Sequence, residues 1–393
     1  MGDLIALAVP AGPQLIDLIT ESWDRGDAFA PLDPKMAPRQ RTEQLAVIAP
    51  TVVLHLDEDG RLHRDSHDGH PVADGDALVL TTSGTDGRPK AVVHTHDSIS
   101  ASAQATSNAL SVDPLVDKWL ACLPVTHIGG LSVILRSLVT GTPVDVHDGF
   151  DPERVRRAAT VGGATLVSLV TRALNQVPAE LFRTILIGGA AAPADLPGNV
   201  IPTYGMTETG SGVVYGKHIL DGCEIQIIDD DHNPVDGPGI SGRIALRGPM
   251  LFRGYRSADG VVSNPFVDGA WFPTDDLGHW NDDGSLAVEG RRGDVIVTGG
   301  RKVWPTPIEQ LLAARPDIAE VAVVGRPDPD WGHRVVAVVV PSDPGTPPTV
   351  ESLKDTVLEH LPPWWAPKEL VVRTTPLPRT SLGKLRRPVV LPD

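Results

Sequence analysis

The amino-acid sequence predicts an α/β protein: a large N-terminal domain of α/β subdomains with a small β-rich subdomain, then a small α+β domain at the C-terminus. From Ala77 to about Gly189, strand-like runs alternate with helical ones, which is the pattern of an α/β domain. Beyond Cys223, short strands such as EIQIID and GRIALRG are separated by turns of Gly, Pro and Asp, which predicts the β-rich subdomain. A second mixed pattern begins near Gly293, so we predict two domains, 1–292 and 293–393.

The N-terminal domain is expected to begin with a helix and a buried element. Residues 12–23 are expected to form an amphipathic helix, because their apolar side chains fall on or near one side. Residues 41–56 are expected to form a buried element that ends in the strand VVLHL. Within the alternating region, strands and helices are expected at 119–123, 131–139, 144–146, 152–159, 165–170 and 184–187.

The C-terminal domain has a helix start signal of its own. Thr306 is expected to be the N-cap, with Pro307 at the first helical position and Glu309 completing a capping box. Two strands and a second helix follow, and they are expected at 321–324, 335–340 and about 350–361.

Composition excludes several classes of protein. Lysine and arginine number 34 and aspartate and glutamate 50, so the net charge of −16 argues against non-specific binding to nucleic acid or to an anionic membrane. Two cysteines are too few for a disulfide framework. No apolar run approaches about 18 residues, so no transmembrane helix is expected. The N-terminus lacks the basic segment of a secretory signal. A cytoplasmic enzyme is predicted, and a homodimer is left open.

The segment Thr81–Lys90, TTSGTDGRPK, has the composition of a loop that binds phosphate. Glycines let backbone N–H groups approach phosphate oxygens, hydroxyls donate hydrogen bonds, and Arg88 or Lys90 supplies positive charge. The kinase-type P-loop is excluded, because the two glycines are three residues apart and alanine follows the lysine. The residues that follow are rich in β-branched side chains, so the loop is predicted to join two strands.

Six further motifs follow this loop along the chain. They are GGAAAP (188–193), YGMTETGS (204–211), GRIALRGPMLFRGY (242–255), WFPTDDLG (271–278), GRRGDVIVTGGRKVWPTPIE (290–309) and PLPRTSLGKLRR (376–387). In this order and spacing they resemble the adenylate-forming superfamily of acyl- and aryl-CoA ligases, luciferases and carrier-protein adenylation domains. The resemblance runs from about residue 77 to the C-terminus. LPVTHIGGLSVILRSLVTG (123–141) looks like o-succinylbenzoate–CoA ligase of menaquinone biosynthesis, although the region before the phosphate loop is shorter than usual.

The resemblance implies a reaction in two halves, with ATP and coenzyme A as co-substrates. A carboxylate attacks the α-phosphate to give an acyl-adenylate and pyrophosphate, and the thiol of CoA then displaces AMP. Lys384 occupies the place of the family's catalytic lysine, which bridges carboxylate and phosphate; taken alone, it would be interpreted as part of a solvated basic patch. Because the family's C-terminal domain rotates between the two halves, residues 293–393 are expected to be mobile.

The same resemblance assigns the nucleotide and metal contacts. Thr207 is expected at the α-phosphate, Tyr204 on the adenine and Glu208 on Mg²⁺, which prefers hard oxygen ligands and substrate phosphates. A surface glutamate on a capped loop is the structural alternative for Glu208. The phosphate-binding set is Thr82, Ser83, Gly84, Thr85, Lys90 and Thr207. The adenine- and ribose-binding set is Gly188, Gly189, Ala190, Tyr204, Gly205, Asp276 and Arg291.

Two ribose-binding assignments have a neighbouring rival. Asp276 resembles the aspartate whose carboxylate accepts from both ribose hydroxyls, but Asp275 is adjacent and the choice between them stays open. A polar turn is the structural alternative for both. Arg291 is preferred over Arg292 because of the G-R-x-x-D spacing.

The thiol half implies a second set of glycines. Gly299 and Gly300 match the loop along which the pantetheine arm of CoA passes close to the backbone, and a plain tight turn is the alternative. The hinge position holds Gly293, where the family usually has Asp, Lys or Ser; glycine can absorb the change in φ and ψ.

The acyl side is implied by the narrower resemblance. His127 is expected against the acyl group, in both the catalytic and the substrate-binding sets, with a buried structural histidine as the alternative. Gly129, Gly130 and Arg136 complete the substrate-binding set, and Arg136 supplies a cation for a second carboxylate unless it is structural. His94 and His96 alternate on a predicted strand and are interpreted as structural, since they have no metal-ligand spacing with cysteine.

Three functions are therefore weighed. The first is ATP-dependent ligation of o-succinylbenzoate to CoA with release of AMP and pyrophosphate. The second is another aryl- or acyl-CoA ligase, or an enzyme that loads a carrier protein. The third is a non-catalytic nucleotide-binding relative, against which Lys384, Glu208 and Asp276 argue. The expected partners are a small aromatic carboxylate, ATP and CoA, without nucleic acid or membrane insertion.

Overall fold

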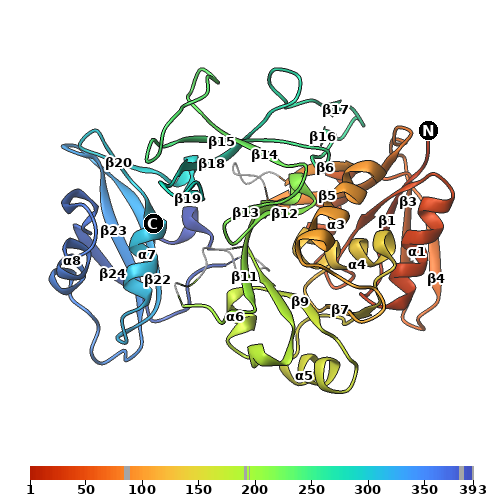
Figure 1. Cartoon of the computed structure of the whole chain (residues 1–393), viewed down its shortest axis with the longest axis horizontal. Coiled ribbons are helices and arrows are strands. Elements are labelled where there is room, and N and C mark those ends of the chain that lie inside the picture. The colour runs from red at the N-terminus through yellow and green to blue at the C-terminus, as the bar shows by residue number, and fades with distance from the viewer. Residues whose placement is uncertain (84–88, 190–192, 194, 380–384, 392–393) are drawn as a thin grey trace. The chain divides into compact units, whose positions relative to one another are not determined.

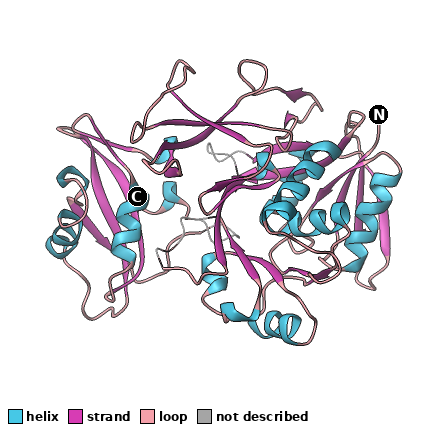
Figure 2. Cartoon of the chain, viewed as in Figure 1, coloured by secondary structure: helices cyan, strands magenta, loops and turns pink. Residues whose placement is uncertain are grey.

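The computed structural model describes the chain except for residues 84–88, 190–192, 194, 380–384 and 392–393 (Figure 1). The predicted α/β class is confirmed, since helices and strands alternate through most of the chain (Figure 2). The chain forms two compact units: residues 1–225 with 246–272, and residues 226–245 with 273–393. The domain boundary at 292/293 remains a prediction.

The first unit contains two large sheets. The eight-stranded sheet has the order β17-β16-β6-β5-β2-β1-β3-β4. Its strands are β1 (Leu4–Ala8), β2 (Ala28–Pro31), β3 (Val52–Leu56), β4 (Leu62–Ser66), β5 (Asp76–Ser83), β6 (Pro89–Thr95), β16 (Gly254–Arg256) and β17 (Val262–Ser263). The seven-stranded sheet has the order β13-β12-β11-β10-β9-β7-β8. Its strands are β7 (Trp119–Ala121), β8 (Val144–Val146), β9 (Leu166–Leu169), β10 (Thr184–Ile187), β11 (Val200–Met206), β12 (Ser211–Tyr215) and β13 (His218–Ile219).

Helices cover both sheets of this unit and lie between them. They are α1 (Pro13–Asp24), α2 (Pro38–Ile48), α3 (His96–Ala109), α4 (Ile128–Thr140), α5 (Pro152–Thr160) and α6 (Thr171–Leu174). Side chains of α1, α3 and α4 join residues of both sheets in one apolar core. The other face of the seven-stranded sheet packs on α5 and α6, and that of the eight-stranded sheet on α2. The unit therefore has the layers α–β–α–β–α.

The second unit contains most of a four-stranded sheet and all of a five-stranded one. The former has the order β14-β15-β18-β19, with β14 (Glu224–Ile228), β15 (Gly242–Arg247), β18 (Phe272–Trp280) and β19 (Leu286–Arg291). The latter has the order β21-β20-β23-β22, with β24 beside β23. Its elements are β20 (Ile296–Thr298), β21 (Arg301–Val303), α7 (Pro305–Ala313), β22 (Ile318–Asp328), β23 (Gly332–Pro341), α8 (Val350–Leu358) and β24 (Glu369–Val372). Both helices pack on one face of this sheet.

Three local predictions are corrected by the structure. Helix α7 begins at Pro305 with Trp304 as its N-cap, and the Glu309 carboxylate accepts from the Val323 backbone N–H at 2.7 Å, so no capping box forms at Thr306. Residues 41–56 are not one buried element, because they begin inside helix α2 (Pro38–Ile48), in which only Ile48 is buried. His96 starts helix α3 and is not on the strand, because Thr95 and Ser98 form a capping box at this point.

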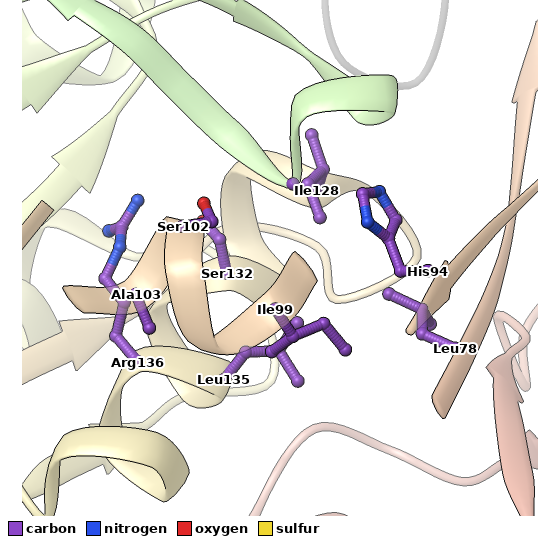
Figure 3. A pocket seen from close by; sticks show the side chains of 10 residues that line it. Leu78, His94, Ile99, Ser102, Ala103, Ile128, Ser132, Leu135 and Arg136 are labelled. Carbon is purple, nitrogen blue, oxygen red and sulfur yellow. The ribbon is translucent and has the colours of Figure 1, made fainter. Parts of the chain in front are cut away.

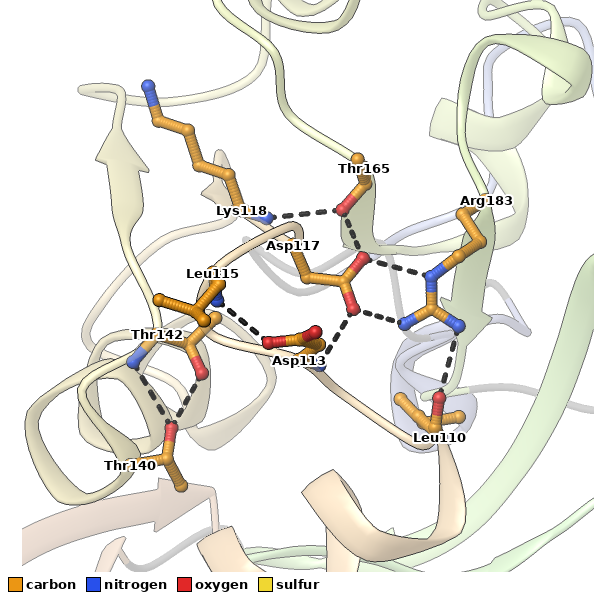
Figure 4. Close-up of polar contacts among 9 residues, drawn as sticks. All are labelled: Leu110, Asp113, Leu115, Asp117, Lys118, Thr140, Thr142, Thr165 and Arg183. Carbon is orange, nitrogen blue, oxygen red and sulfur yellow. Dashed lines mark hydrogen bonds and ion pairs between the residues drawn. The ribbon is translucent and has the colours of Figure 1, made fainter.

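An ion pair between the buried Asp117 and the half-exposed Arg183 connects three loops at one end of the seven-stranded sheet (Figure 4). The Asp117 carboxylate accepts from Arg183 Nε at 2.9 Å and Nη2 at 2.8 Å, and from the Thr165 hydroxyl at 2.7 Å. Arg183 also donates to the carbonyl of Leu110 at 3.0 Å. Burial raises the pKa of Asp117, but these hydrogen bonds outweigh it and hold that pKa below its usual value. No helix in the described ranges has the length and apolarity to cross a bilayer.

Candidate active site

The motif YGMTETGS turns sharply at the end of β11, and the backbone needs glycine there. A β-bulge separates Tyr204 from Gly205 in the pairing of β11 with β12. A Cβ at Gly205 would lie 2.2 Å from the carbonyl oxygen of Ser211, so no larger residue fits. The chain then enters a 3₁₀-helix, Thr207–Thr209, which presents the predicted phosphate and metal residues.

Glu208 is held by the segment that follows β15. The backbone N–H of Phe252 donates to the Glu208 carbonyl at 2.9 Å. The Tyr255 hydroxyl donates to Oε1 of the Glu208 carboxylate at 2.8 Å. Both main chain and side chain of Glu208 are therefore fixed from one short segment, 252–255.

Thr207 is held from strand β6 by His94, which is fully buried. His94 Nε2 lies 2.7 Å from the Thr207 carbonyl oxygen, and Nδ1 lies 2.9 Å from the Ser98 hydroxyl. Because a carbonyl only accepts, Nε2 carries the proton. Burial lowers the pKa of His94 to about 4, so the ring is neutral at neutral pH. The structural interpretation of His94 therefore holds, but what it supports is the predicted α-phosphate residue.

The predicted phosphate loop connects β5 and β6, two antiparallel neighbours, as expected. Thr82 pairs with Lys90 across this hairpin. The Lys90 ammonium lies 5.1 Å from the centre of the Tyr255 ring, within the range of a cation–π contact. Gly84, Thr85 and the side chain of Ser83 lie outside the described residues.

Three of the four residues predicted for the acyl side, His127, Gly129 and Gly130, lie at the N-terminal end of α4. His127 is its N-cap residue, and its carbonyl accepts from the N–H groups of Gly130 and Leu131 at 3.1 and 2.9 Å. A Cβ at Gly130 would lie 2.5 Å from the carbonyl oxygens of Leu123 and Pro124, so this glycine serves close packing. A Cβ at Gly129 would meet nothing within 4 Å, so this exposed glycine faces open space.

Arg136 lies two turns further along α4 and lines a small cavity (Figure 3). The guanidinium is 2% exposed, lies over the Trp119 ring at 5.0 Å and donates from Nη2 to the Ser211 hydroxyl. Its Nε and Nη1 have no hydrogen-bond partner among the described residues. The cavity measures about 10 Å³, about the space of one water molecule. Burial lowers the pKa of Arg136, because the charged guanidinium is less stable here than in water.

The other lining residues come from β5, β6, α3, the start of α4 and the end of the YGMTETG segment. They are Leu78, His94, Ile99, Ser102, Ala103, Ile128, Ser132, Leu135 and Gly210. Arg136 and His94 therefore border one cavity, although 42 positions separate them. The cavity is therefore lined both by helix α4 and by the end of the segment that carries Glu208.

The predicted ribose residues lie in the second unit. Asp276 and Arg291 face each other across β18 and β19, with Arg291 Nε 3.7 Å from the Asp276 carboxylate. Their rivals have other partners: Asp275 lies 3.7 Å from Arg243, and Arg292 lies 3.1 Å from Asp230. The geometry therefore favours Asp276 with Arg291 as a pair.

Among the remaining predicted glycines, some are required by a positive φ and one by close packing. Gly299 and Gly300 have φ of +54° and +76° at the turn between β20 and β21, which is the two-residue hairpin that glycine favours. Gly189 also has positive φ, and a Cβ at Gly188 would lie 2.9 Å from the Thr203 hydroxyl. A Cβ at Gly293 would meet nothing within 4 Å. Ala190 and Lys384 lie outside the described residues.

The comparison with protein families matches almost the whole chain in two parts. Residues 1–256 match the family described as AMP-binding enzyme, and residues 307–384 match the AMP-binding enzyme C-terminal domain. The chain belongs to the AMP-binding enzyme family.

Two relatives within the AMP-binding family are both named as 2-succinylbenzoate–CoA ligases. A probable 2-succinylbenzoate–CoA ligase of Mycobacterium tuberculosis is 37% identical over 343 residues, which cover 81% of this chain and 85% of the relative. A 2-succinylbenzoate–CoA ligase of Listeria innocua is 33% identical, covering 79% of this chain and 68% of the relative.

Solved structures agree as well. The o-succinylbenzoate CoA synthetase of Bacillus subtilis, in complex with the acyl-adenylate intermediate OSB-AMP, superposes with a TM-score of 0.86 at 27% identity and covers 100% of this chain and 88% of that one. The same enzyme in complex with ATP and magnesium ion gives 0.85 at 27% identity, covering 99% and 89%. The predicted resemblance is confirmed.

The residues of the first unit fit Mg²⁺ that arrives with a nucleotide. Among the residues that the structure describes, no group of three or more His, Cys, Asp or Glu side chains could hold a metal ion. Glu208 offers one oriented carboxylate, and Mg²⁺ is typically bound by one or two carboxylates, waters and substrate phosphates. A resident, all-protein metal site is not what this arrangement provides.

For two residues of the site, the sequence predicts no functional role. Tyr255 ends the quoted motif GRIALRGPMLFRGY but is not among the predicted contacts. His94 is interpreted only as structural. The motif itself is a signal for Tyr255, whereas no local pattern connects His94 with Thr207.

Proposed function

We propose that this protein is an AMP-forming ligase that joins 2-succinylbenzoate to coenzyme A through an acyl-adenylate, a step of menaquinone biosynthesis. The observation that carries the proposal is similarity to 2-succinylbenzoate–CoA ligases across most of the chain, at 37% identity over 81% of its length for one of them. The proposal includes a cytoplasmic location, because ATP and CoA are its substrates. Whether the protein is a homodimer stays open.

In the adenylation half, a carboxylate oxygen of the acid bonds to the α-phosphorus of ATP while the bond to the pyrophosphate oxygen breaks. Thr207 contacts the α-phosphate in this proposal, and the hydrogen bond from His94 to its carbonyl supports its position. Lys90 and Thr82 bind the departing pyrophosphate, and Lys384 bridges carboxylate and phosphate. When bound with ATP, Mg²⁺ neutralises phosphate charge, and Glu208 is its protein ligand.

The acid itself is recognised from α4. 2-Succinylbenzoate has a second carboxylate that does not react, and Arg136 is a buried cation with two unpartnered N–H groups on the acyl side. The cavity beside it has room for about one water, so this carboxylate is bound through a water or after a small rearrangement of the lining side chains. In this proposal His127 and Gly129 border the acyl group, and a Cβ at Gly129 would meet nothing within 4 Å.

In the thiol half, the sulfur of CoA loses its proton to water and bonds as a thiolate to the acyl carbon, and AMP leaves with the electron pair of the broken acyl–oxygen bond. Within the second unit, Asp276 and Arg291 bind the ribose hydroxyls and so keep the adenylate in place until then. The proposal takes residues 293–393 as a mobile domain that turns at Gly293 and brings Gly299 and Gly300 to the pantetheine arm.

The test measures both halves separately. Purified protein is incubated with 2-succinylbenzoate, ATP and Mg²⁺; pyrophosphate release is followed, and the acyl-adenylate is sought by mass spectrometry. CoA is added second, and the thioester is measured. A panel of other aromatic and aliphatic acids runs in parallel, and preference for another acid would reassign the substrate. ATP binding without pyrophosphate release for any acid would favour a non-catalytic relative.

Lys384→Ala tests the residue that the mechanism depends on most. We expect adenylation to fall by at least about a hundredfold, since the lysine bridges both reacting groups. Arg386→Ala is the matched control, an exposed cation two positions away in the same basic segment, and it should retain activity. Equal activity of the two variants would exclude the catalytic role of Lys384.

A further inference from the structure

Tyr255 contacts two oppositely charged groups, to which the proposed function assigns the departing pyrophosphate and the divalent cation. Its hydroxyl donates to the Glu208 carboxylate at 2.8 Å, and its ring lies 5.1 Å below the Lys90 ammonium. Neither Lys90 nor Glu208 has an ion-pair partner among the residues that the structure describes. Tyr255 therefore contacts the two charges through different parts of one side chain, the hydroxyl and the ring.

The Tyr255 ring is fixed by the sheet and by an aromatic neighbour. Strand β16 pairs antiparallel with β6, so that Tyr255 lies opposite Val92, two positions beyond Lys90. The ring packs edge-on against Phe252 with centroids 4.8 Å apart. Gly254 allows the strand to lie this close to β17, since a Cβ there would be 2.1 Å from the Ser263 carbonyl oxygen.

We propose that Tyr255 is a positioning residue for the divalent cation that accompanies ATP. Its hydroxyl orients the Glu208 carboxylate by occupying one acceptor position of Oε1, which leaves the other lone pairs for the cation. Its aromatic ring at the same time contacts the Lys90 ammonium, so one side chain positions both charges that the nucleotide–metal complex would meet. This inference rests on the proposed function, because it assumes that Glu208 is the metal ligand.

The expected size of the effect follows from what a hydrogen bond to a metal ligand does. Mg²⁺ needs near-ideal octahedral geometry, so a carboxylate that rotates freely binds it less well. Loss of an outer hydrogen bond to a ligand typically costs 10- to 100-fold in metal affinity. Because phosphates also hold the cation, the lower end, about tenfold, is expected for Tyr255→Phe.

The experiment measures metal binding without turnover. Mn²⁺, which reports by electron paramagnetic resonance, is titrated into the protein together with α,β-methylene-ATP, whose α–β bond is not cleaved in adenylation. Tyr255→Phe keeps the ring over Lys90 and removes only the hydroxyl. Tyr215→Phe is the matched control, because its hydroxyl makes a 3.0 Å hydrogen bond with Thr106 in the same unit.

We expect the Kd of Mn²⁺ to rise about tenfold in Tyr255→Phe and to stay within twofold in Tyr215→Phe. In a Glu208→Ala background, Tyr255→Phe should have no further effect, because the hydroxyl acts through that carboxylate. A Kd within twofold of the unmodified protein, or an equal loss in the Glu208→Ala background, overturns the inference. Tyr255→Leu also removes the ring, and it should additionally raise the Kd of the ATP analogue.

The two proposals fail in different ways. Protein that binds Mn²⁺ with the analogue but releases no pyrophosphate from any acid refutes the proposed function, while the Tyr255 comparison still gives its answer. Protein that adenylates 2-succinylbenzoate with an unchanged Mg²⁺ requirement in Tyr255→Phe retains the proposed function and refutes the role of Tyr255. Thermal unfolding of each folded variant separates a loss of metal affinity from a loss of stability.

Discussion

Replacing His94 by glutamine should change how the stability of this protein depends on pH. The imidazole is fully buried, and burial lowers its pKa from the ordinary 6.5 to about 4. Between those values the unfolded chain binds a proton that the folded chain does not. Stability must therefore fall as the pH drops from 6.5 towards 4, and it must be fully present above 6.5.

The magnitude follows from the two pKa values. A tenfold difference in proton affinity is worth about 1.4 kcal/mol, so the full effect is about 3 kcal/mol. By pH 4.5 most of it, about 2–3 kcal/mol, has been lost. Glutamine does not titrate, yet its amide can donate to the Thr207 carbonyl as His94 Nε2 does at 2.7 Å. His94→Leu cannot donate and leaves that carbonyl unsatisfied, which costs about 1–3 kcal/mol at every pH.

The assay is urea unfolding of the unmodified protein, His94→Gln and His94→Leu at pH 7 and pH 4.5. Between these conditions the unmodified protein should lose about 2–3 kcal/mol more than His94→Gln does, because all other titrating groups are shared. Equal losses, within about 0.5 kcal/mol, would refute a buried neutral histidine. Adenylation should also decline more in His94→Leu than in His94→Gln, since Thr207 loses its support only in the former.

Three further outcomes are expected. Arg183→Met should destabilise the protein by about 2 kcal/mol in urea unfolding, because the buried Asp117 carboxylate loses its partner. The loss is limited because Arg183 is half-exposed and its side chain is well solvated in the unfolded chain. Arg172→Met, which lies outside this pair, is the control. Arg136→Met should raise the KM for 2-succinylbenzoate at least about tenfold and leave that for ATP unchanged; a drop in stability with an unchanged KM would make Arg136 structural. Gly130→Ala should cost about 2 kcal/mol or more through its 2.5 Å overlap, whereas Gly129→Ala, with open space, should unfold like the unmodified protein.

Sequence patterns predict those parts of the fold that depend on one segment. Helix α1 follows from its apolar side, and the β5–β6 hairpin follows from two β-branched runs around a glycine-rich loop. The start of α7 is different, because the Glu309 carboxylate that would complete the capping box binds strand β22 instead. Glu309 binds the N–H of Val323 and pairs with Arg387, partners 14 and 78 positions away. A capping box is a local pattern, and here a tertiary contact prevails over it.

The candidate site also has features that short motifs predict and features that depend on tertiary contacts. The order of the motifs identifies the adenylate-forming resemblance without a structure, because each motif is a contiguous stretch with its own composition. It also predicts roles for Glu208 and Thr207, but it does not reveal what holds these residues.

By itself, then, the sequence determined the fold class, the family and the candidate contacts to ATP, acid and CoA, all of which are encoded in short runs of residues. Only the tertiary structure decided that His94 supports Thr207 from 113 positions away and that Tyr255 supports Glu208 from 47 positions away. The physical reason is that these hydrogen bonds depend on the register in which β6 and β16 pair, and on the turn after β11. Such contacts join segments that are distant along the chain, so no local periodicity, charge pattern or turn signal predicts them.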